Sequence, residues 1–356
     1  MTIRYGIIGT GMMGCEHIRN LAAMDDVDIL AVADPNEEPR QWARKYCADR
    51  FTPSVHEDYR DLLDNDDIDA LVVASPNFTH IDLMRDVFKT DKHVMLEKPM
   101  CTTLADALEL DNSAALHKGI VWIGLEYRYM PTTSALLLHL PEVGNVKMCA
   151  IQEHRFPFLR KVGDWNRFNR NTGGTLVEKC CHFFDLMNLV VPGNPKRVIA
   201  SGAQSVNHLD EVYNGKVPDI LDNAYVIVEY DTGARAMLDL CMFAEGSKFE
   251  QMIAVTGDEG KLETTVPGDE VFISKRERNS GKSVPIEIDA RVKHEGFHHG
   301  SSFLEHREFI DAIREEKPPS VTTHDGLMSV LVGMAAQESI ETGQAVDIQN
   351  LLTSNQ

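Results

Sequence analysis

The first third of the chain alternates short apolar runs with segments that repeat apolar residues at helical spacing. The apolar runs that we interpret as strands are residues 3–8, 28–34, 68–77 and 93–99. Between the last two, residues 79–89 carry apolar positions three and four apart, as an amphipathic helix does. This alternation predicts βαβ units, and therefore a parallel sheet with helices on its faces.

The pattern changes in the remainder of the chain. Strand-like segments succeed one another at 145–156, 224–243 and 251–266, and helices become fewer. Gly233 and the glycines of Gly257–Gly260 lie where tight turns would join such strands into hairpins. We therefore expect a mainly antiparallel sheet in this part of the chain.

Two segments near the C-terminus, 301–320 and 324–343, have apolar spacing of helix length and close on Pro or Gly. A chain of 356 residues also favours two domains over one. The expected fold class is α/β. A doubly wound parallel sheet of the Rossmann type is expected in 1–126, and an α/β domain on a large, mostly antiparallel sheet in 127–356.

Composition narrows the classes of function. A formal charge of −20 disfavours binding to nucleic acid or to an acidic membrane, because both need clustered Lys and Arg. No window is apolar enough to span a bilayer, and the N-terminus lacks the features of a secretory signal. The seven cysteines show no CxxC spacing, so we expect free thiols and a cytoplasmic protein.

The first apolar run leads into the sequence GTGMMG, which precedes a helical stretch. The first glycine permits a tight turn, the second lets backbone approach a pyrophosphate, and the third lets the helix pack closely. The amides at the N-terminus of that helix would face the anion. The expected cofactor contacts of this loop are Gly9, Gly11, Met12, Met13 and Gly14.

The second apolar run ends at Asp34, where the dinucleotide fold places a carboxylate against the ribose 2′-hydroxyl. Pro35 and Asn36 follow it, instead of the Arg or Lys that would accept a 2′-phosphate. The Asp34 carboxylate would itself repel that phosphate. The sequence therefore predicts NAD as the cofactor in preference to NADP.

Polar residues follow two further apolar runs. In parallel sheets ligands bind beyond the carboxyl ends of the strands, so these residues should border the cofactor crevice. They are Ser75, Pro76, Asn77, Glu97 and Lys98. The position of the charged pair Glu97 and Lys98 directly after a buried strand thus indicates a site rather than a solvated turn.

A later segment, NTGGTLVEKCCHFFDLMNLVVPG, predicts one helix between its glycines and its Pro-Gly pair. The helix is apolar almost all round, yet Glu178, His182 and Asp185 share one face. This stripe either faces solvent or lines a cleft, where a His beside a carboxylate has the composition of a general acid/base site. Cys180 and Cys181 are expected to be buried packing residues rather than metal ligands.

Together these motifs resemble the Gfo/Idh/MocA oxidoreductase family over nearly the whole chain. The resemblance rests on the order and spacing of GTGMMG with Asp34, SPNFTH at 75–80, EKP at 97–99, EYRYMP at 126–131, GGTLVEKCCHFFD at 173–185 and VTGDEGKLE at 255–263. It implies a dinucleotide-binding domain, followed by an α/β domain whose large open sheet commonly mediates dimers or tetramers. It also implies substrates such as sugars, polyols or inositols.

The resemblance implies roles for individual residues by their position in these motifs. Lys98 looks like the family's active-site lysine, near both the nicotinamide and the reacting hydroxyl, and Pro99 resembles a proline that often follows a cis peptide bond. His182 looks like the acid/base histidine. Glu178 stands where the family usually has Asp, and its longer carboxylate could orient the hydroxyl or His182. His80 closes the SPNFTH motif and joins the expected cofactor contacts.

Further polar residues are expected in the substrate wall. The expected substrate contacts are Tyr127, Arg128, Arg155, Trp165, Glu178 and His182, with His154 and Arg167 as further candidates. Arg128 stands where the family has an arginine. An equal alternative to a substrate contact is that Arg128 forms a structural ion pair at the domain junction. His294, His298 and His299 lack suitable partners, so no metal site is predicted there.

The expected activity is transfer of a hydride between a secondary alcohol of a sugar, polyol or inositol and NAD. Two alternatives stay open: a glycoside hydrolase or lyase that oxidises its sugar transiently and retains NAD, and a non-catalytic protein that senses NAD or a sugar. The presence of both Lys98 and His182 favours an enzyme, because a sensor needs no acid/base pair. The expected assembly is a homodimer or homotetramer. The sequence leaves open the particular substrate, the oxidised carbon and the direction of the reaction.

Overall fold

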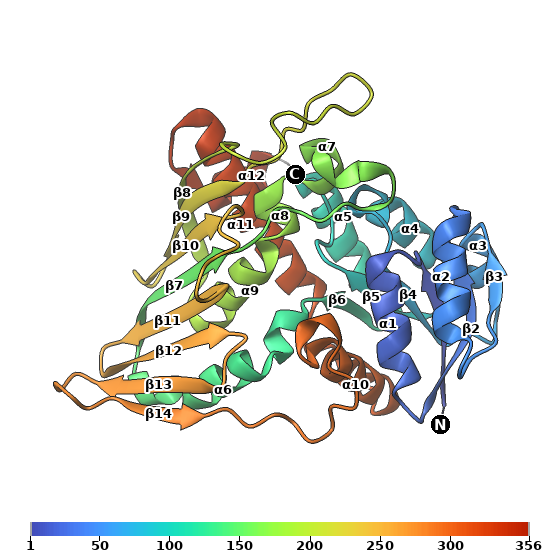
Figure 1. The fold of residues 1–356 in the computed structure, drawn as a ribbon, viewed down its shortest axis with the longest axis horizontal. Coiled ribbons are helices and arrows are strands. Elements are labelled where there is room, and N and C mark those ends of the chain that lie inside the picture. Colours follow the sequence, from blue (N-terminus) through green and yellow to red (C-terminus); the bar gives the residue numbers. More distant parts are fainter. Residues whose placement is uncertain (1, 355–356) are drawn as a thin grey trace. The chain divides into compact units, whose positions relative to one another are not determined.

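The computed structural model describes residues 2–354, which form two compact units (Figure 1). The first unit consists of the described residues up to Tyr129, together with Lys161–Gly163 and Ala290–Leu327. The second unit contains the other described residues. A single boundary at residue 126 therefore does not describe the two units completely. A late part of the chain returns to the first.

The first unit is built on a six-stranded parallel sheet, as the alternating pattern predicts. In spatial order its strands are β3 (Ser54–His56), β2 (Val27–Ala33), β1 (Ile3–Ile8), β4 (Ala70–Val73), β5 (His93–Glu97) and β6 (Val121–Gly124). Ile8, the last residue of β1, pairs with Ala33 of β2 and with Val73 of β4. The carboxyl ends of these central strands therefore meet at one edge of the sheet.

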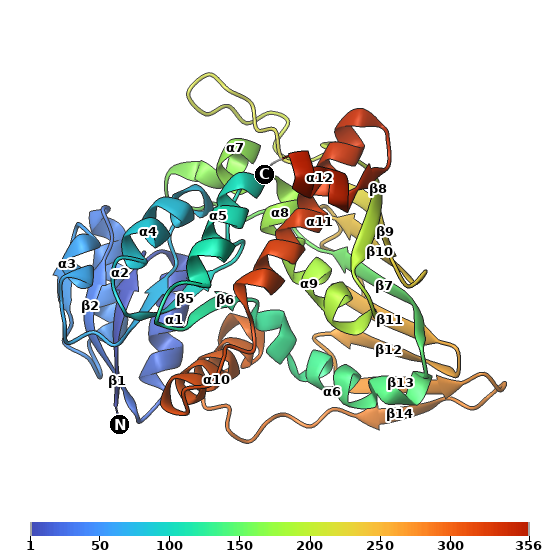
Figure 2. The same cartoon turned by 180° about the vertical axis from the view of Figure 1, so that it is seen from behind.

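Helices cover both faces of this sheet. Those of the N-terminal segment are α1 (Met12–Ala22), α2 (Glu37–Cys47), α3 (Arg60–Leu63), α4 (His80–Val87) and α5 (Leu104–Ala114). α1 packs against α2 on one face, and α4 packs against α5 on the other, as Figure 1 and Figure 2 show from opposite sides. All four residues of β4 are buried between these layers.

Part of the C-terminal segment completes the first unit. α10 (Ser301–Arg314) packs against α1 and against the 3-10 turn η2 (Glu126–Tyr129). Asp26, in the turn after α1, accepts hydrogen bonds from Arg307 Nη1 at 2.7 Å and from Arg314 Nη1 at 2.6 Å. Burial alone would raise the pKa of Asp26, but the two arginines outweigh it and lower that pKa to about 2. These ion pairs tie α10 to the N-terminal sheet.

The second unit is built on a nine-stranded sheet, antiparallel except where β7 runs parallel to β10. In spatial order its strands are β14 (Lys282–Pro285), β13 (Glu270–Lys275), β12 (Gly260–Val266), β11 (Gln251–Gly257), β7 (Val146–His154), β10 (Arg235–Cys241), β9 (Asn223–Tyr230), β8 (Pro195–Ala203) and β15 (Val346–Asp347). Gly233, with a φ of +82°, lies in the turn between β9 and β10. The predicted antiparallel sheet and both predicted hairpins are confirmed.

Side chains alternate between a buried and an exposed face of this sheet. α6 (Pro131–His139), α9 (Cys181–Val190) and the later part of α11 (Thr323–Thr342) lie along the buried face (Figure 2). Beneath them, Leu238 of β10 and Ile151 of β7 are paired neighbours in the core. The opposite face carries exposed side chains, several of them apolar.

The helix predicted as one continuous element in the second unit is broken into two. α8 (Thr175–Glu178) ends before Lys179, and α9 begins at Cys181, so the prediction of a single helix is wrong. Lys179 Nζ lies 3.0 Å from the buried carboxylate of Glu153 on β7. Apolar periodicity carries no information about such a tertiary ion pair, which holds the chain at the break.

Short elements complete the fold. They are η1 (Asn77–Thr79), η3 (Leu140–Val143), η4 (Val162–Arg167), α7 (Asn169–Thr172), η5 (Gly296–His298) and α12 (Ile348–Ser354). The seven cysteines are free thiols, as predicted. Across residues 2–354, no helix is long and apolar enough to cross a membrane.

Candidate active site

The glycine loop after β1 has the geometry of a dinucleotide cradle. Gly9 has a φ of +86°, and a Cβ there would lie 2.6 Å from a carbonyl oxygen of the loop after β4. A Cβ at Gly14 would lie 2.0 Å from the Gly9 carbonyl oxygen, so only glycine lets α1 approach the loop. Beside Gly11 the space is open, which fits the approach of a pyrophosphate. Met12 and Met13 form the first turn of α1.

Asp34, directly after β2, faces this loop. Its Oδ2 accepts a hydrogen bond from the backbone N–H of Thr10 at 2.9 Å, and its Oδ1 accepts one from the N–H of Asn36 at 2.9 Å. Arg40 lies nearby, but it donates to the Asp34 carbonyl oxygen and pairs with Glu37 at 2.6 Å. The Arg40 guanidinium is thus occupied by these partners. The charged group that faces the cradle is the Asp34 carboxylate.

His80 joins the two segments that follow β4 and β5. Its ring is fully buried. Nε2 lies 3.1 Å from the Ser75 carbonyl oxygen, and Nδ1 lies 2.9 Å from the Pro99 carbonyl oxygen. Burial lowers the pKa of this imidazole. Asn77 is also buried. His80 therefore lies between the SPNFTH and EKP motifs in the interior of the unit, and the Lys98–Pro99 peptide bond inside the EKP motif is cis.

Lys98 stands at the carboxyl end of β5. It is half-buried, and its backbone N–H donates to Oε2 of Glu97 at 3.2 Å. The adjacent strand β4 is followed by a turn that contains Thr79. The Thr79 hydroxyl lies 2.7 Å from the Pro76 carbonyl oxygen and 2.8 Å from Ser75 Oγ, and these contacts close the turn. The predicted residues after β4 and β5 are thus neighbours at one edge of the first unit's sheet.

In the second unit, the polar stripe is buried. Glu178, His182 and Asp185 have exposed fractions of 3%, 2% and 1%. Of the two interpretations of this stripe, the solvent-facing one is therefore wrong. Glu178 ends α8 and His182 lies in the first turn of α9, so the two residues stand on either side of the helix break.

A buried carboxylate that sequence reasoning missed lies beside this break. Oε1 of Glu153 is 3.0 Å from Lys179 Nζ and 3.3 Å from Arg155 Nη1. A buried charge is costly without partners, so the three groups stabilise one another's positions. Through this cluster, Lys179, which follows Glu178, is linked to Glu153 and Arg155 at the end of β7. The only sequence signal is that Glu153 shares the inward parity of Ile151 on its strand.

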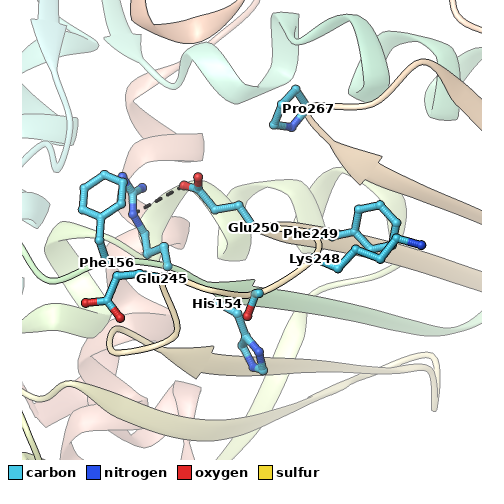
Figure 3. Close-up of a pocket in the computed structure, with 9 residues that line it drawn as sticks. His154, Phe156, Glu245, Lys248, Phe249, Glu250 and Pro267 are labelled. Atoms are coloured by element: carbon cyan, nitrogen blue, oxygen red, sulfur yellow. Dashed lines mark ion pairs between the residues drawn. The ribbon is translucent and has the colours of Figure 1, made fainter.

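Arg155 also lines an open pocket of about 300 Å³ (Figure 3). Its guanidinium lies 4.3 Å from the ring centre of Phe156, and its Nε is 3.5 Å from Glu250 Oε1, the ion pair drawn as a dashed line. His154 lines the same pocket and pairs with Asp239 at 3.0 Å. Aromatic surface beside charged, hydrogen-bonding groups suits a small polar ligand.

Arg128 is held within the first unit. Its Nη2 lies 3.1 Å from Asp325 Oδ1, and its Nη1 donates to the Ser320 carbonyl oxygen at 3.2 Å. Burial alone would raise the pKa of Asp325, but Arg128 lowers it. Tyr127, the neighbouring candidate, is buried in η2. A structural ion pair for Arg128 is therefore present, and Asp325 and Ser320 both belong to the first unit.

Trp165 and Arg167 both lie in η4. The Trp165 carbonyl oxygen accepts a hydrogen bond from Asn171 Nδ2 at 2.9 Å, and its side chain is half-buried. Arg167 is 2% exposed, and its Nε donates to Glu211 Oε2 at 3.0 Å. This partly buried ion pair gives Arg167 a structural role.

The histidine-rich segment lies in the first unit, before α10. His298 Nε2 is 3.6 Å from Glu126 Oε1, His294 is half-buried, and His299 has a φ of +52°. Within the part of the chain that the structure describes, no group of three or more His, Cys, Asp or Glu side chains is arranged to hold a metal ion.

A doubly wound sheet with a glycine cradle and an aspartate beyond its second strand defines a dinucleotide-binding protein. Comparison with known families agrees. Residues 3–125 match the NAD-binding Rossmann fold of the Gfo/Idh/MocA oxidoreductase family, and residues 139–348 match its C-terminal alpha/beta domain. The chain belongs to this family.

Individual relatives match over nearly the whole chain. The chain is 26% identical over 360 residues to the myo-inositol 2-dehydrogenase of Thermotoga maritima, which covers 98% of this chain and 100% of that protein. It is 23% identical to the scyllo-inositol 2-dehydrogenase (NAD(+)) of Bacillus subtilis, with coverages of 97% and 96%. A solved structure of levoglucosan dehydrogenase in complex with NADH has a TM-score of 0.85 at 19% identity, covering 98% of this chain and 99% of that one. This last likeness shows the fold.

Proposed function

We propose that the protein is an NAD-dependent dehydrogenase that oxidises a secondary alcohol of a sugar, polyol or inositol. The observation that carries the proposal is the position of Lys98, directly after β5 in a unit that also contains a dinucleotide cradle. The family's full-length relatives include inositol 2-dehydrogenases, which supports this substrate class.

The residues proposed to hold the cofactor fit a dinucleotide. They are Gly9, Gly11, Met12, Met13, Gly14, Asp34, Ser75, Pro76, Asn77, His80, Glu97 and Lys98. The open space at Gly11 suits the pyrophosphate, and the carboxylate of Asp34 suits a ribose hydroxyl. Asn77 and His80 are both buried, so in this proposal they support the cofactor-binding segments from the interior.

In the proposed reaction, His182 accepts the proton of the substrate hydroxyl as a general base. The ammonium group of Lys98 stabilises the negative charge that develops on the same oxygen. NAD, when bound, supplies the hydride acceptor, so the alcohol carbon becomes a carbonyl. Glu178 orients the hydroxyl or His182.

The proposed substrate wall consists of Tyr127, Arg128, Arg155 and Trp165, together with Glu178 and His182. Arg155 has the strongest support, because it lines a pocket and shares the buried carboxylate of Glu153 with Lys179. Arg128 stays a candidate beside its ion pair with Asp325.

Cofactor choice follows from Asp34. We expect the protein to bind NADH at least about tenfold more tightly than NADPH, because hydrogen bonds to a charged group are worth roughly 1.5–3 kcal/mol and a 2′-phosphate would face like charge. Asp34→Ala should weaken NADH binding and bring the two dissociation constants together. Fluorescence titration with each reduced cofactor measures both constants.

The matched control for this titration is Asp28→Ala, at the opposite end of the same strand β2, which should leave the ratio of dissociation constants unchanged. Equal affinities for NADH and NADPH in the unaltered protein would contradict the role given to Asp34.

We also propose that a second copy of the chain covers the exposed face of the nine-stranded sheet, giving a homodimer or homotetramer. Pairing across the strands places Ile199, Ile227, Met237, Ala150 and Ala254 in one continuous apolar row. A neighbouring row carries both signs of charge, in Arg197, Glu229 and Arg235. Because it combines apolar residues with both charges, this face can complement itself about a twofold axis.

This assembly can be tested with Ile227→Lys, in the middle of the apolar row. The variant should lower the molar mass measured by light scattering after size exclusion, since a buried lysine opposes the contact. Leu116→Lys, a substitution of an isolated exposed leucine in the first unit, should leave the mass unchanged. A monomeric unaltered protein, or an unchanged mass in Ile227→Lys, would contradict the proposal.

A small-molecule substrate and a cytoplasmic location are part of the same proposal. The net charge of −20 supports a partner other than nucleic acid, and seven free thiols suit a reducing compartment.

The activity is tested by NADH formation from NAD with a panel of inositols, polyols, aldoses and sugar acids. We expect absorbance to rise with one stereochemical class. If no member of the panel is oxidised although NAD binds tightly, the proposed dehydrogenase activity is wrong.

A further inference from the structure

Three buried side chains form a continuous hydrogen-bonded series inside the first unit, beside Lys98. Glu97 Oε1 lies 2.9 Å from His17 Nε2, and His17 Nδ1 lies 2.9 Å from His306 Nε2. The exposed fractions of Glu97, His17 and His306 are 5%, 1% and 0%. The three residues come from β5, α1 and α10, so this series, here called the histidine link, joins three elements that are distant in sequence.

The direction of these hydrogen bonds follows from chemistry. An ionised carboxylate can only accept, so His17 Nε2 carries a proton and donates to Glu97. Burial, with a smaller contribution from His17, lowers the pKa of His306 well below its ordinary value, so its ring is neutral. A neutral His306 can donate from Nε2 to Nδ1 of His17.

The other oxygen of Glu97 contacts the backbone of the proposed active-site lysine. Oε2 accepts the backbone N–H of Lys98 at 3.2 Å, so the two oxygens are shared between α1 and the residue that carries the ammonium group. Burial alone would raise the pKa of Glu97, but the hydrogen bond from His17 and the nearby positive charges lower it. The further titratable groups that face Glu97 are His80 of α4, His298 of η5 and Glu305 of α10.

The histidine link also has a defined position relative to the cradle. His17 lies on α1, one turn beyond Gly14, on the same helix whose first turn borders the glycine loop. His17 itself is not among the groups that we assign to the cofactor or the substrate, so its replacement removes none of them and leaves Glu97 without its histidine donor.

We propose that His17 is a positioning residue of the reaction, which holds the Glu97 carboxylate ionised and oriented so that Lys98 keeps its place and its charge. This inference rests on the proposed function. Without the His17 donor, a buried carboxylate takes up a proton more readily. A neutral Glu97 no longer stabilises the adjacent ammonium, so Lys98 loses its proton at a lower pH.

The test compares His17→Leu, which removes the donor, with His17→Gln, whose amide can still donate to Glu97. In His17→Leu we expect kcat to fall by about 10- to 100-fold, as a misplaced reactive group does. The alkaline limb of the kcat profile should move to lower pH, while the dissociation constant of NADH changes less than about threefold. His17→Gln should recover most of kcat and the original limb. His93→Leu, at the far end of β5, is the control and should leave the pH profile unchanged.

The ring nitrogens of ¹⁵N-labelled histidine give a second measurement that needs no turnover. We expect the His17 ring nitrogens to give the signals of hydrogen-bonded nitrogens, and we expect Glu97→Gln to shift the signal of Nε2. A His17→Leu variant with unaltered kcat and pH profile would overturn the inference, as would a loss of kcat and NADH binding together that His17→Gln does not recover. An inactive unaltered protein would contradict the proposed function itself, whereas activity without an effect of His17→Leu would contradict only this inference.

Discussion

His182→Ala is expected to lower kcat by at least about 10²–10⁴-fold, which is the usual contribution of general acid/base catalysis. His182 is 2% exposed in the first turn of α9, beside a helix break held by the ion pair of Lys179 and Glu153. Such a fixed, buried imidazole suits transfer of a proton from a bound hydroxyl. NADH binding should change little, because the residues assigned to the cofactor all lie in the other unit.

Steady-state kinetics with the preferred substrate, together with NADH titration, check this expectation. His139→Ala is a matched control, since this imidazole is paired with Glu142 at 2.8 Å at the end of α6 and has no assigned role. It should retain the kcat of the unaltered enzyme. Turnover of His182→Ala equal to that of the unaltered enzyme would remove His182 from the mechanism.

Lys98→Met is expected to lower kcat by about 10²–10³-fold, the typical effect of removing one group that stabilises developing negative charge. Methionine keeps the unbranched apolar stem and removes the ammonium, so the change isolates the charge. Because Lys98 is also among the proposed cofactor contacts, a modest rise in the dissociation constant of NADH is expected beside the larger loss of kcat.

The comparison needs both kinetic constants and cofactor affinity for Lys98→Met and for Lys118→Met. Lys118 is a surface lysine that pairs with Asp91 at 2.8 Å, and its substitution should alter neither quantity. If Lys98→Met turned over substrate within about threefold of the unaltered enzyme, charge stabilisation by this residue would be excluded.

Local sequence signals predicted the first unit well. The alternation of apolar runs with helical spacing yields the parallel sheet, because strand and helix periods differ clearly along the chain. The roles of Gly9 and Gly14 were also predictable, since only glycine permits the close contacts found there. The contact of Asp34 with the glycine loop follows from the order of the first two strands.

Contacts between distant residues were not predictable from these signals. His17 and His306 are separated by 289 positions, and neither lies in a motif that sequence analysis singled out. The return of α10 to the first unit depends on Asp26 and its two arginine partners, which local patterns do not pair. The ion pair beside the break between α8 and α9 likewise involves Glu153, a residue on another element.

The proposed chemistry is tested most directly by following deuterium from a carbon-deuterated substrate of the preferred class into the cofactor. The hydride mechanism predicts that NADH accumulates with deuterium at C4 of the nicotinamide, in step with formation of the carbonyl product. Product that forms while the label returns to the sugar, without net NADH, would contradict net dehydrogenation and indicate a hydrolase or lyase that retains its cofactor. NAD binding with no label transfer from any substrate in the panel would contradict catalysis by hydride transfer altogether.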